Sequence, residues 1–138
     1  MVYYRSGEIL NAAIRMEIAG RIFYQELQKK AEQEEKRILF AYLADEEQKH
    51  RELFEGLKKE KGVFRTEFGY DLEDYHMGLN LLEESAVFRT DEEAIRMAQR
   101  SRSAEEALDA AIRFEKDSIL YYQEMRPIVA QEYHGILD

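Results

Sequence analysis

Three segments of the chain carry apolar residues at alternating spacings of three and four, and each interrupts that pattern with a glutamate near its middle. This spacing places the residues on one face of an α-helix, as in helices that pack in a bundle. The three stripes are Leu10, Ala13, Glu17, Gly20, Tyr24, Leu27 and Ala31; Phe40, Leu43, Glu47, His50, Phe54 and Leu57; and Ala104, Leu108, Ala111, Glu115, Ser118, Tyr122 and Met125. The pattern predicts three long helices over about residues 6–31, 35–61 and 103–125.

The rest of the chain connects these helices. One proline and 7 glycines among 138 residues, with 36% charged side chains, favour an all-α single domain over a turn-rich sheet. Residues 62–102 lack a long stripe and predict a crossover with one or two short helical pieces. Capping boxes at Thr90-x-x-Glu93 and Ser103-x-x-Glu106 each predict the start of a helix. Pro127 ends the third long helix, and a fourth begins after about residue 130, so we expect a four-helix bundle whose fourth helix is largely missing from this chain.

Composition restricts the partners and the chemistry. A formal net charge of -9 repels phosphate backbones and anionic lipid surfaces, so we expect neither nucleic acid nor a membrane as partner. The N-terminus has no apolar signal-peptide core, and we expect a cytoplasmic protein. There is no cysteine, which excludes thiolate metal sites and thiol nucleophiles. Any metal must therefore be bound through oxygen and nitrogen.

The polar residues within the stripes are predicted to meet in one layer. In a hairpin that turns near residue 32, Glu17 and Glu47 are equally far from the turn. Glu115 lies as far from Ser103, the start of the third predicted helix, as Glu47 lies from residue 35, the start of the second. If the crossover makes these two helices parallel, Glu115 reaches the same level as Glu47. Residues three apart on a helix are neighbours, which places His50 beside Glu47. Several buried carboxylates repel one another, and multivalent cations such as iron, manganese or zinc would stabilise them.

Two alternatives remain open from the residues alone. Arg21 and Arg113 could reach the carboxylates and form a metal-free ionic layer. Glu46, one turn before His50, could replace Glu47 as a ligand, although the stripe favours Glu47.

The run Ala44-Asp-Glu-Glu-Gln-Lys-His50, Glu17 followed by Tyr24, and the run from Ala111 to Tyr122 resemble the rubrerythrin-type ferritin-like proteins. The resemblance implies a di-iron centre in a ferritin-like bundle, with manganese or zinc as substitute metals. It implies that Glu17 and Glu115 are single-carboxylate ligands and that Glu47 with His50 forms the first of two Glu-x-x-His pairs. Tyr24 and Tyr122 would then hydrogen-bond to the site; otherwise they are core residues.

The sequence departs from that family in three respects. The second Glu-x-x-His pair falls beyond residue 138, and Glu132 and His134 are too far apart around a helix to replace it. Either the chain is shortened or the site is completed from another molecule, and we expect a homo-oligomer, with a dimer favoured. Ser118 stands where rubrerythrins carry an additional glutamate ligand. The cysteine-containing electron-transfer module is absent, so electrons would come from an external donor protein.

These features predict a di-iron oxidoreductase that acts on O2 or peroxide, or a ferroxidase that handles iron. The alternative is a non-enzymatic helical interaction module with an ionic layer in its core.

Overall fold

The structure, a computed structural model, describes residues 2–60, 63 and 72–137. Its regular elements are α1 (Val2–Lys30), α2 (Glu34–Lys58), α3 (Leu72–Glu84), α4 (Asp91–Arg100), α5 (Ala104–Met125) and α6 (His134–Leu137), with 3-10 turns at Arg126–Ile128 and Gln131–Tyr133. The fold is therefore all-α, as predicted. None of the described helices is long and apolar enough to cross a membrane.

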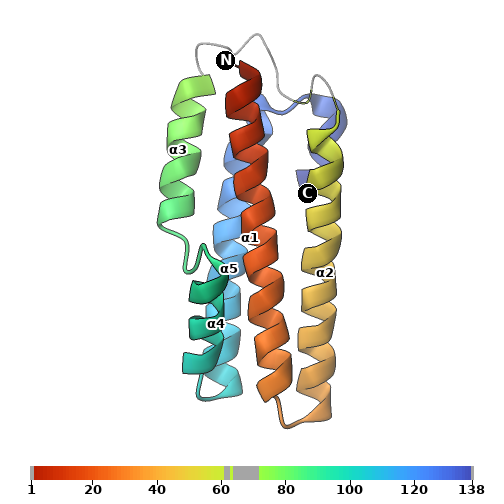
Figure 1. Ribbon diagram of the computed structural model, residues 1–138, viewed down its shortest axis with the longest axis vertical. Helices are drawn as coiled ribbons and strands as arrows, with labels where there is room; N and C mark the ends of the chain where they lie inside the picture. The colour runs from red at the N-terminus through yellow and green to blue at the C-terminus, as the bar shows by residue number, and fades with distance from the viewer. Residues whose placement is uncertain (1, 61–62, 64–71, 138) are drawn as a thin grey trace.

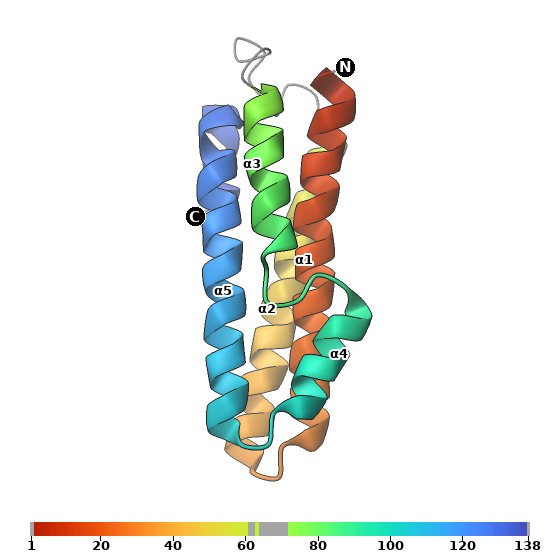
Figure 2. The same cartoon turned by 90° about the vertical axis from the view of Figure 1, so that its left-hand side faces the viewer.

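The long helices form a bundle around α1 (Figure 1). α1 and α2 are an antiparallel hairpin, and α5 runs parallel to α2 on the side of the bundle opposite α1 (Figures 1 and 2). α3 and α4 lie one below the other and together return the chain along the bundle (Figure 2). α3 is one of the short helical pieces predicted for the crossover, and α4 is the helix predicted from the Thr90 capping box. α1 packs closely along α2 and α4, whereas α5 packs mainly against α3.

Capping explains where α4 and α5 begin. The Thr90 hydroxyl accepts a hydrogen bond from the Glu93 amide at 3.1 Å, and the Ser103 hydroxyl accepts one from the Glu106 amide at 3.2 Å. Both predicted capping boxes are thus present at helix N-termini. The Lys30 ammonium caps the other end of α4 by donating to three carbonyl oxygens, those of residues 98, 99 and 101.

The observed boundaries differ from the predicted ones at three points. α1 begins at Val2, four residues before the predicted start of the first helix. α2 ends at Lys58, three residues before the predicted end. Beyond Pro127 the chain forms the two 3-10 turns and the single turn α6, which correspond to the predicted start of a fourth helix. The Ala130 amide donates to the Val63 carbonyl at 2.6 Å and ties this segment to the end of the hairpin.

The core consists of two apolar clusters along the bundle axis. One contains Ile9 to Met16 of α1 with Phe54, Leu57, Tyr121 and Met125. The other contains Ala19 to Leu27 of α1 with Phe40, Ala44, Phe88 and Phe114. In the second cluster the Phe114 ring stacks on Phe88 with centroids 4.8 Å apart and lies directly over Gly20, which leaves no room for a side chain there. Between the two clusters lies a polar layer, the candidate site, to which all three long helices contribute: Glu17, Glu47, His50, Glu115 and Ser118.

Candidate metal centre

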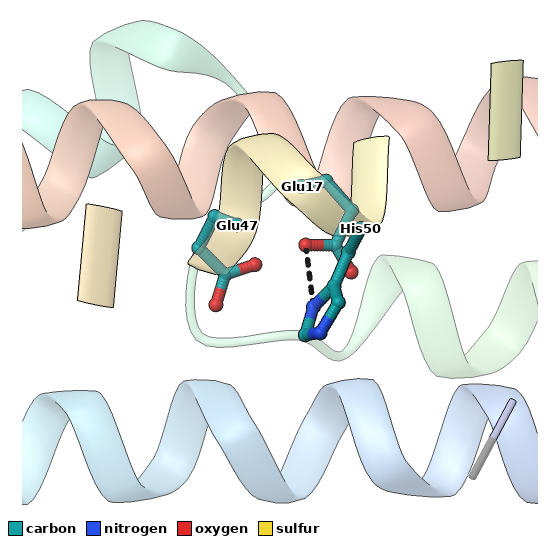
Figure 3. A group of neighbouring side chains, drawn as sticks. All are labelled: Glu17, Glu47 and His50. Atoms are coloured by element: carbon teal, nitrogen blue, oxygen red, sulfur yellow. Dashed lines mark ion pairs between the residues drawn. The ribbon is translucent and has the colours of Figure 1, made fainter. Parts of the chain in front are cut away.

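Glu17, Glu47 and His50 form the centre of the polar layer. Their ligand atoms all lie within 4.8 Å of one another. Glu17 is 1% exposed and Glu47 is 3% exposed, while the His50 side chain remains 43% exposed. In Figure 3 the Glu17 carboxylate from α1 and the His50 imidazole from α2 point toward each other, with Nδ1 3.5 Å from Oε2. The fold thus brings the buried acid of α1 next to the buried acid and the imidazole of α2.

Glu115 reaches the same cavity from α5. It lines a space of about 510 Å³ together with Glu17, Glu47, His50 and Ser118. The charge of Glu115 and its hydrogen-bonding contact with Glu47 both raise the pKa of Glu47, so the two side chains are close neighbours. The predicted convergence of three carboxylates and one imidazole is therefore present in the geometry.

Two tyrosines hold carboxylates of this layer in place. The Tyr24 hydroxyl donates a hydrogen bond to Glu115 Oε1 at 2.8 Å, and the Tyr122 hydroxyl donates to Glu17 Oε1. Tyr24 is fully buried within the second apolar cluster, so it serves both as a core residue and as a hydrogen-bond donor. Burial, followed by the charge of Glu115, raises the pKa of Tyr24 and keeps its hydroxyl protonated.

The electrostatics of the layer favour an added positive charge. Burial raises the pKa of Glu47 far above its ordinary value, and hydrogen bonding and repulsion from Glu17, then Glu115, raise it further. Contact with Glu17 raises the pKa of His50 against the opposing effect of its partial burial. Without a cation, the site therefore retains a proton on Glu47. A metal ion would replace that proton and relieve the repulsion.

The donor set fits a metal ion in a further respect. Glu17 Oε2 and Ser118 Oγ are buried and have no hydrogen-bond partner among the described residues. His50 Nδ1 forms an ion pair with Glu17 Oε2, but their separation of 3.5 Å is longer than that of a good hydrogen bond. A buried carboxylate oxygen without a donor costs stability, typically about 1–3 kcal/mol or more for a charged group. A bound cation would satisfy that oxygen.

The structure also decides between the alternatives left open by the sequence. Glu46 is half-buried and pairs with Lys49 at 3.3 Å, whereas Glu47 points into the cavity. Arg21 donates to Gln48 Oε1 at 3.0 Å, outside the carboxylate layer, and Arg113 is exposed. Neither arginine is seen to form an ionic layer with the three glutamates in the described part of the chain.

In the described part of the segment after Pro127, Glu132 and His134 lie outside the group formed by Glu17, Glu47 and His50. A ring nitrogen of His134, Nε2, lies 2.8 Å from the Val129 carbonyl oxygen, and Glu132 is exposed. This agrees with the expectation that the two residues do not replace a second Glu-x-x-His pair.

Comparison with known families adds an independent observation. The family model described as Rubrerythrin matches residues 8–105, well over half of the chain. The chain belongs to the rubrerythrin family. No curated protein and no solved structure gives a significant match.

Rubrerythrins are a ferritin-like family of di-iron proteins, and the match covers α1, α2 and the crossover helices. It includes Glu17, Glu47 and His50 but ends before Glu115. The position of Glu115 therefore rests on the geometry of α5 and on its contacts with Tyr24 and Glu47. The resemblance stated from the sequence, to rubrerythrin-type ferritin-like proteins, is confirmed.

Sequence reasoning missed two features of this site. The pairing of Tyr122 with Glu17, rather than with the glutamate of its own helix, depends on how α5 is rotated against α1. The Ser118 hydroxyl is buried without a hydrogen-bond partner among the described residues, and periodicity carries no signal for that.

Proposed function

We propose that this rubrerythrin-family chain binds two iron ions through Glu17, Glu47, His50 and Glu115 and acts as an oxidoreductase on O2 or peroxide, or as a ferroxidase. The observation that carries the proposal is the Glu17 carboxylate, buried beside Glu47 and His50 with one oxygen that has no hydrogen-bond donor. A set of oxygen ligands with one imidazole and no thiolate suits iron and manganese, and zinc can also occupy it.

The protein's own residues would define how the ions are held. Three carboxylates can each bind through one or two oxygens, so they can bridge neighbouring cations and follow a change in metal charge. The Tyr24 and Tyr122 hydroxyls fix one oxygen each of Glu115 and Glu17, which leaves the other oxygen of each free to bind. The cavity of about 510 Å³ next to these oxygens is large enough for a small oxidant.

A bound iron pair would supply reversible one-electron steps between the ferrous and ferric states. Reduction of one peroxide molecule to two water molecules consumes two electrons and two protons. Glu47 and His50 would hold no proton on their metal-binding atoms, so both protons would come from solvent, which can reach the cavity beside the partly exposed His50. Because these 138 residues contain no cysteine, a donor protein outside them would supply the electrons.

The test is anaerobic loading with Fe(II), removal of unbound metal, and measurement of iron per chain, followed by mixing with H2O2 or O2 while the ferric absorbance is recorded. The proposal predicts bound iron, and rapid oxidation by one of the two oxidants. Glu47→Gln should lose the iron, whereas Glu46→Gln, a neighbour on the same helix that points away from the cavity, should keep it.

Protein that stays free of metal under these conditions, with Fe(II), Mn(II) and Zn(II) each in excess, would contradict the proposal. That result would favour the alternative of a helical interaction module whose polar layer is stabilised by shared protons.

A further inference from the structure

The cavity beside the three glutamates contains a buried hydroxyl that the described chain leaves without a partner. Ser118 is 4% exposed and lines the cavity together with Glu17, whose Oε2 atom is also buried without a hydrogen bond. A cation bound at Glu17 would satisfy the carboxylate oxygen, but the hydroxyl hydrogen of Ser118 would still need an acceptor. A second occupant of the cavity, one that carries an acceptor atom, would meet that need.

The size and the lining of the cavity indicate what this occupant is made of. The volume of about 510 Å³ is typical of pockets that hold small organic molecules, whereas O2 or peroxide fills only a small part of it. Apolar side chains from three helices form part of the wall: Phe54, Ile119, Ile136 and Leu137. Water gains little against such a wall, and an apolar chain placed there is removed from water. The cavity therefore suits a molecule with a polar head and a short apolar chain.

The charge of the metal-loaded layer favours an anionic head. Two divalent ions bring four positive charges and the three glutamates bring three negative charges, so one positive charge remains when the imidazole is neutral. Gln123 and Arg126 also line the cavity and add an amide and a guanidinium. One negative charge on the occupant would balance the layer, and buried charges are stable only when they are balanced in this way.

We propose that the cavity binds a monocarboxylic acid with a short apolar chain. The carboxylate faces the metal ions and accepts a hydrogen bond from the Ser118 hydroxyl, and such charge-assisted bonds are stronger than neutral ones. The chain lies along the apolar wall defined above. This inference rests on the proposed metal function, because without cations the three glutamates would repel a further carboxylate.

The test is isothermal titration calorimetry of the anaerobic Fe(II)-loaded protein, with iron per chain determined on the same sample. The probes are straight-chain acids from acetate to octanoate. The affinity should increase about fourfold for each methylene group that becomes buried, until the cavity is filled. Ser118→Ala should bind the same amount of iron as the wild type but bind hexanoate roughly 10-fold more weakly.

Ser101→Ala is the matched control for the hydroxyl. Ser101 is also buried, at 7% exposed, but it donates to the Met97 carbonyl at 3.0 Å and does not line this cavity. This variant should bind hexanoate as the wild type does. Circular dichroism checks that each variant keeps its helix content.

A second pair of variants tests the apolar wall independently of Ser118. Ile119 and Leu120 are neighbours on α5 with exposed fractions of 52% and 50%, but only Ile119 lines the cavity. Ile119→Ala should weaken the binding of hexanoate more than that of acetate. Leu120→Ala should leave both affinities unchanged.

The inference is overturned if iron-loaded protein binds none of the acids, if the affinity is independent of chain length, or if Ser118→Ala binds hexanoate as tightly as the wild type. Protein that takes up no iron contradicts the proposed function and overturns this inference with it, since the acid is held by the cations. The iron content of the titrated sample distinguishes that case from a loaded site that binds no acid.

Discussion

Replacement of Glu47 by glutamine tests the electrostatics of the polar layer in the metal-free protein. Burial and the neighbouring acids raise the pKa of Glu47 above its unfolded value, so the folded protein holds a proton that the unfolded chain releases above about pH 4.5. Stability therefore falls as pH rises through this window, because the folded state binds more protons than the unfolded state. Glutamine has nearly the same shape and carries no titrating proton, and it removes this dependence.

The size of the effect follows from linkage. One proton corresponds to a slope of up to about 1.4 kcal/mol per pH unit, or about 2.7 kcal/mol between pH 5.5 and 7.5. The unfolding entropy of 138 residues, at about 2.1 cal/mol/K per residue, converts 1 kcal/mol into roughly 3.4 °C. We expect Glu47→Gln to match the wild type near pH 5.5 and to melt up to about 9 °C higher at pH 7.5.

The assay is thermal unfolding followed by circular dichroism in the presence of a chelator, at intervals between pH 5 and 8. His50, whose pKa is also raised, contributes stability below its unfolded pKa that is lost as pH rises, but this contribution is common to both proteins. The difference between wild type and variant therefore isolates Glu47. A difference that stays constant with pH, or a wild type that gains on the variant as pH rises, would refute the reasoning.

Three further substitutions have defined outcomes. Tyr122→Phe removes the donor to Glu17 and should lower the free energy of unfolding by about 1.5 kcal/mol, measured by denaturant titration, and weaken metal binding roughly 10-fold in a competition assay with a coloured chelator. Gly20→Ala places a methyl group against the Phe114 ring and should cost about 1–3 kcal/mol in the same titration; no loss would mean that the ring moves freely. Ser118→Ala removes a buried hydroxyl without a partner and should raise the stability of the metal-free protein by up to about 1 kcal/mol, so a clear destabilisation would reveal an unrecognised bond.

The polar layer was predictable because its residues follow helical periodicity. On α1 the predicted stripe is buried from Leu10 to Leu27. Because other helices pack around α1, a residue that lies slightly off the predicted face is still buried. Glu47 was correctly preferred to Glu46 by the same counting. The height of Glu115 depended on the start of α5, which the Ser103 capping box fixed to within one residue.

The orientation of α5 was less predictable. Leu108 was expected to face the core but is exposed, whereas Phe114 and Tyr121, outside the predicted stripe, are buried. Periodicity identifies an apolar face without showing which helix covers it. α5 carries apolar residues on more than one face, so the stripe alone does not show which face is buried. The start of α1 at Val2 was missed because its first residues carry no capping signal.

The central claim is that Glu17, Glu47, His50 and Glu115 bind metal together. The most direct measurement is a crystal structure of protein loaded with Fe(II), with an anomalous difference map calculated from data at the iron absorption edge. We predict peaks in the polar layer about 2 Å from the oxygens of all three glutamates and from a ring nitrogen of His50. A map without peaks between α1, α2 and α5, in which the three carboxyl groups hydrogen-bond to one another through shared protons, would contradict the account.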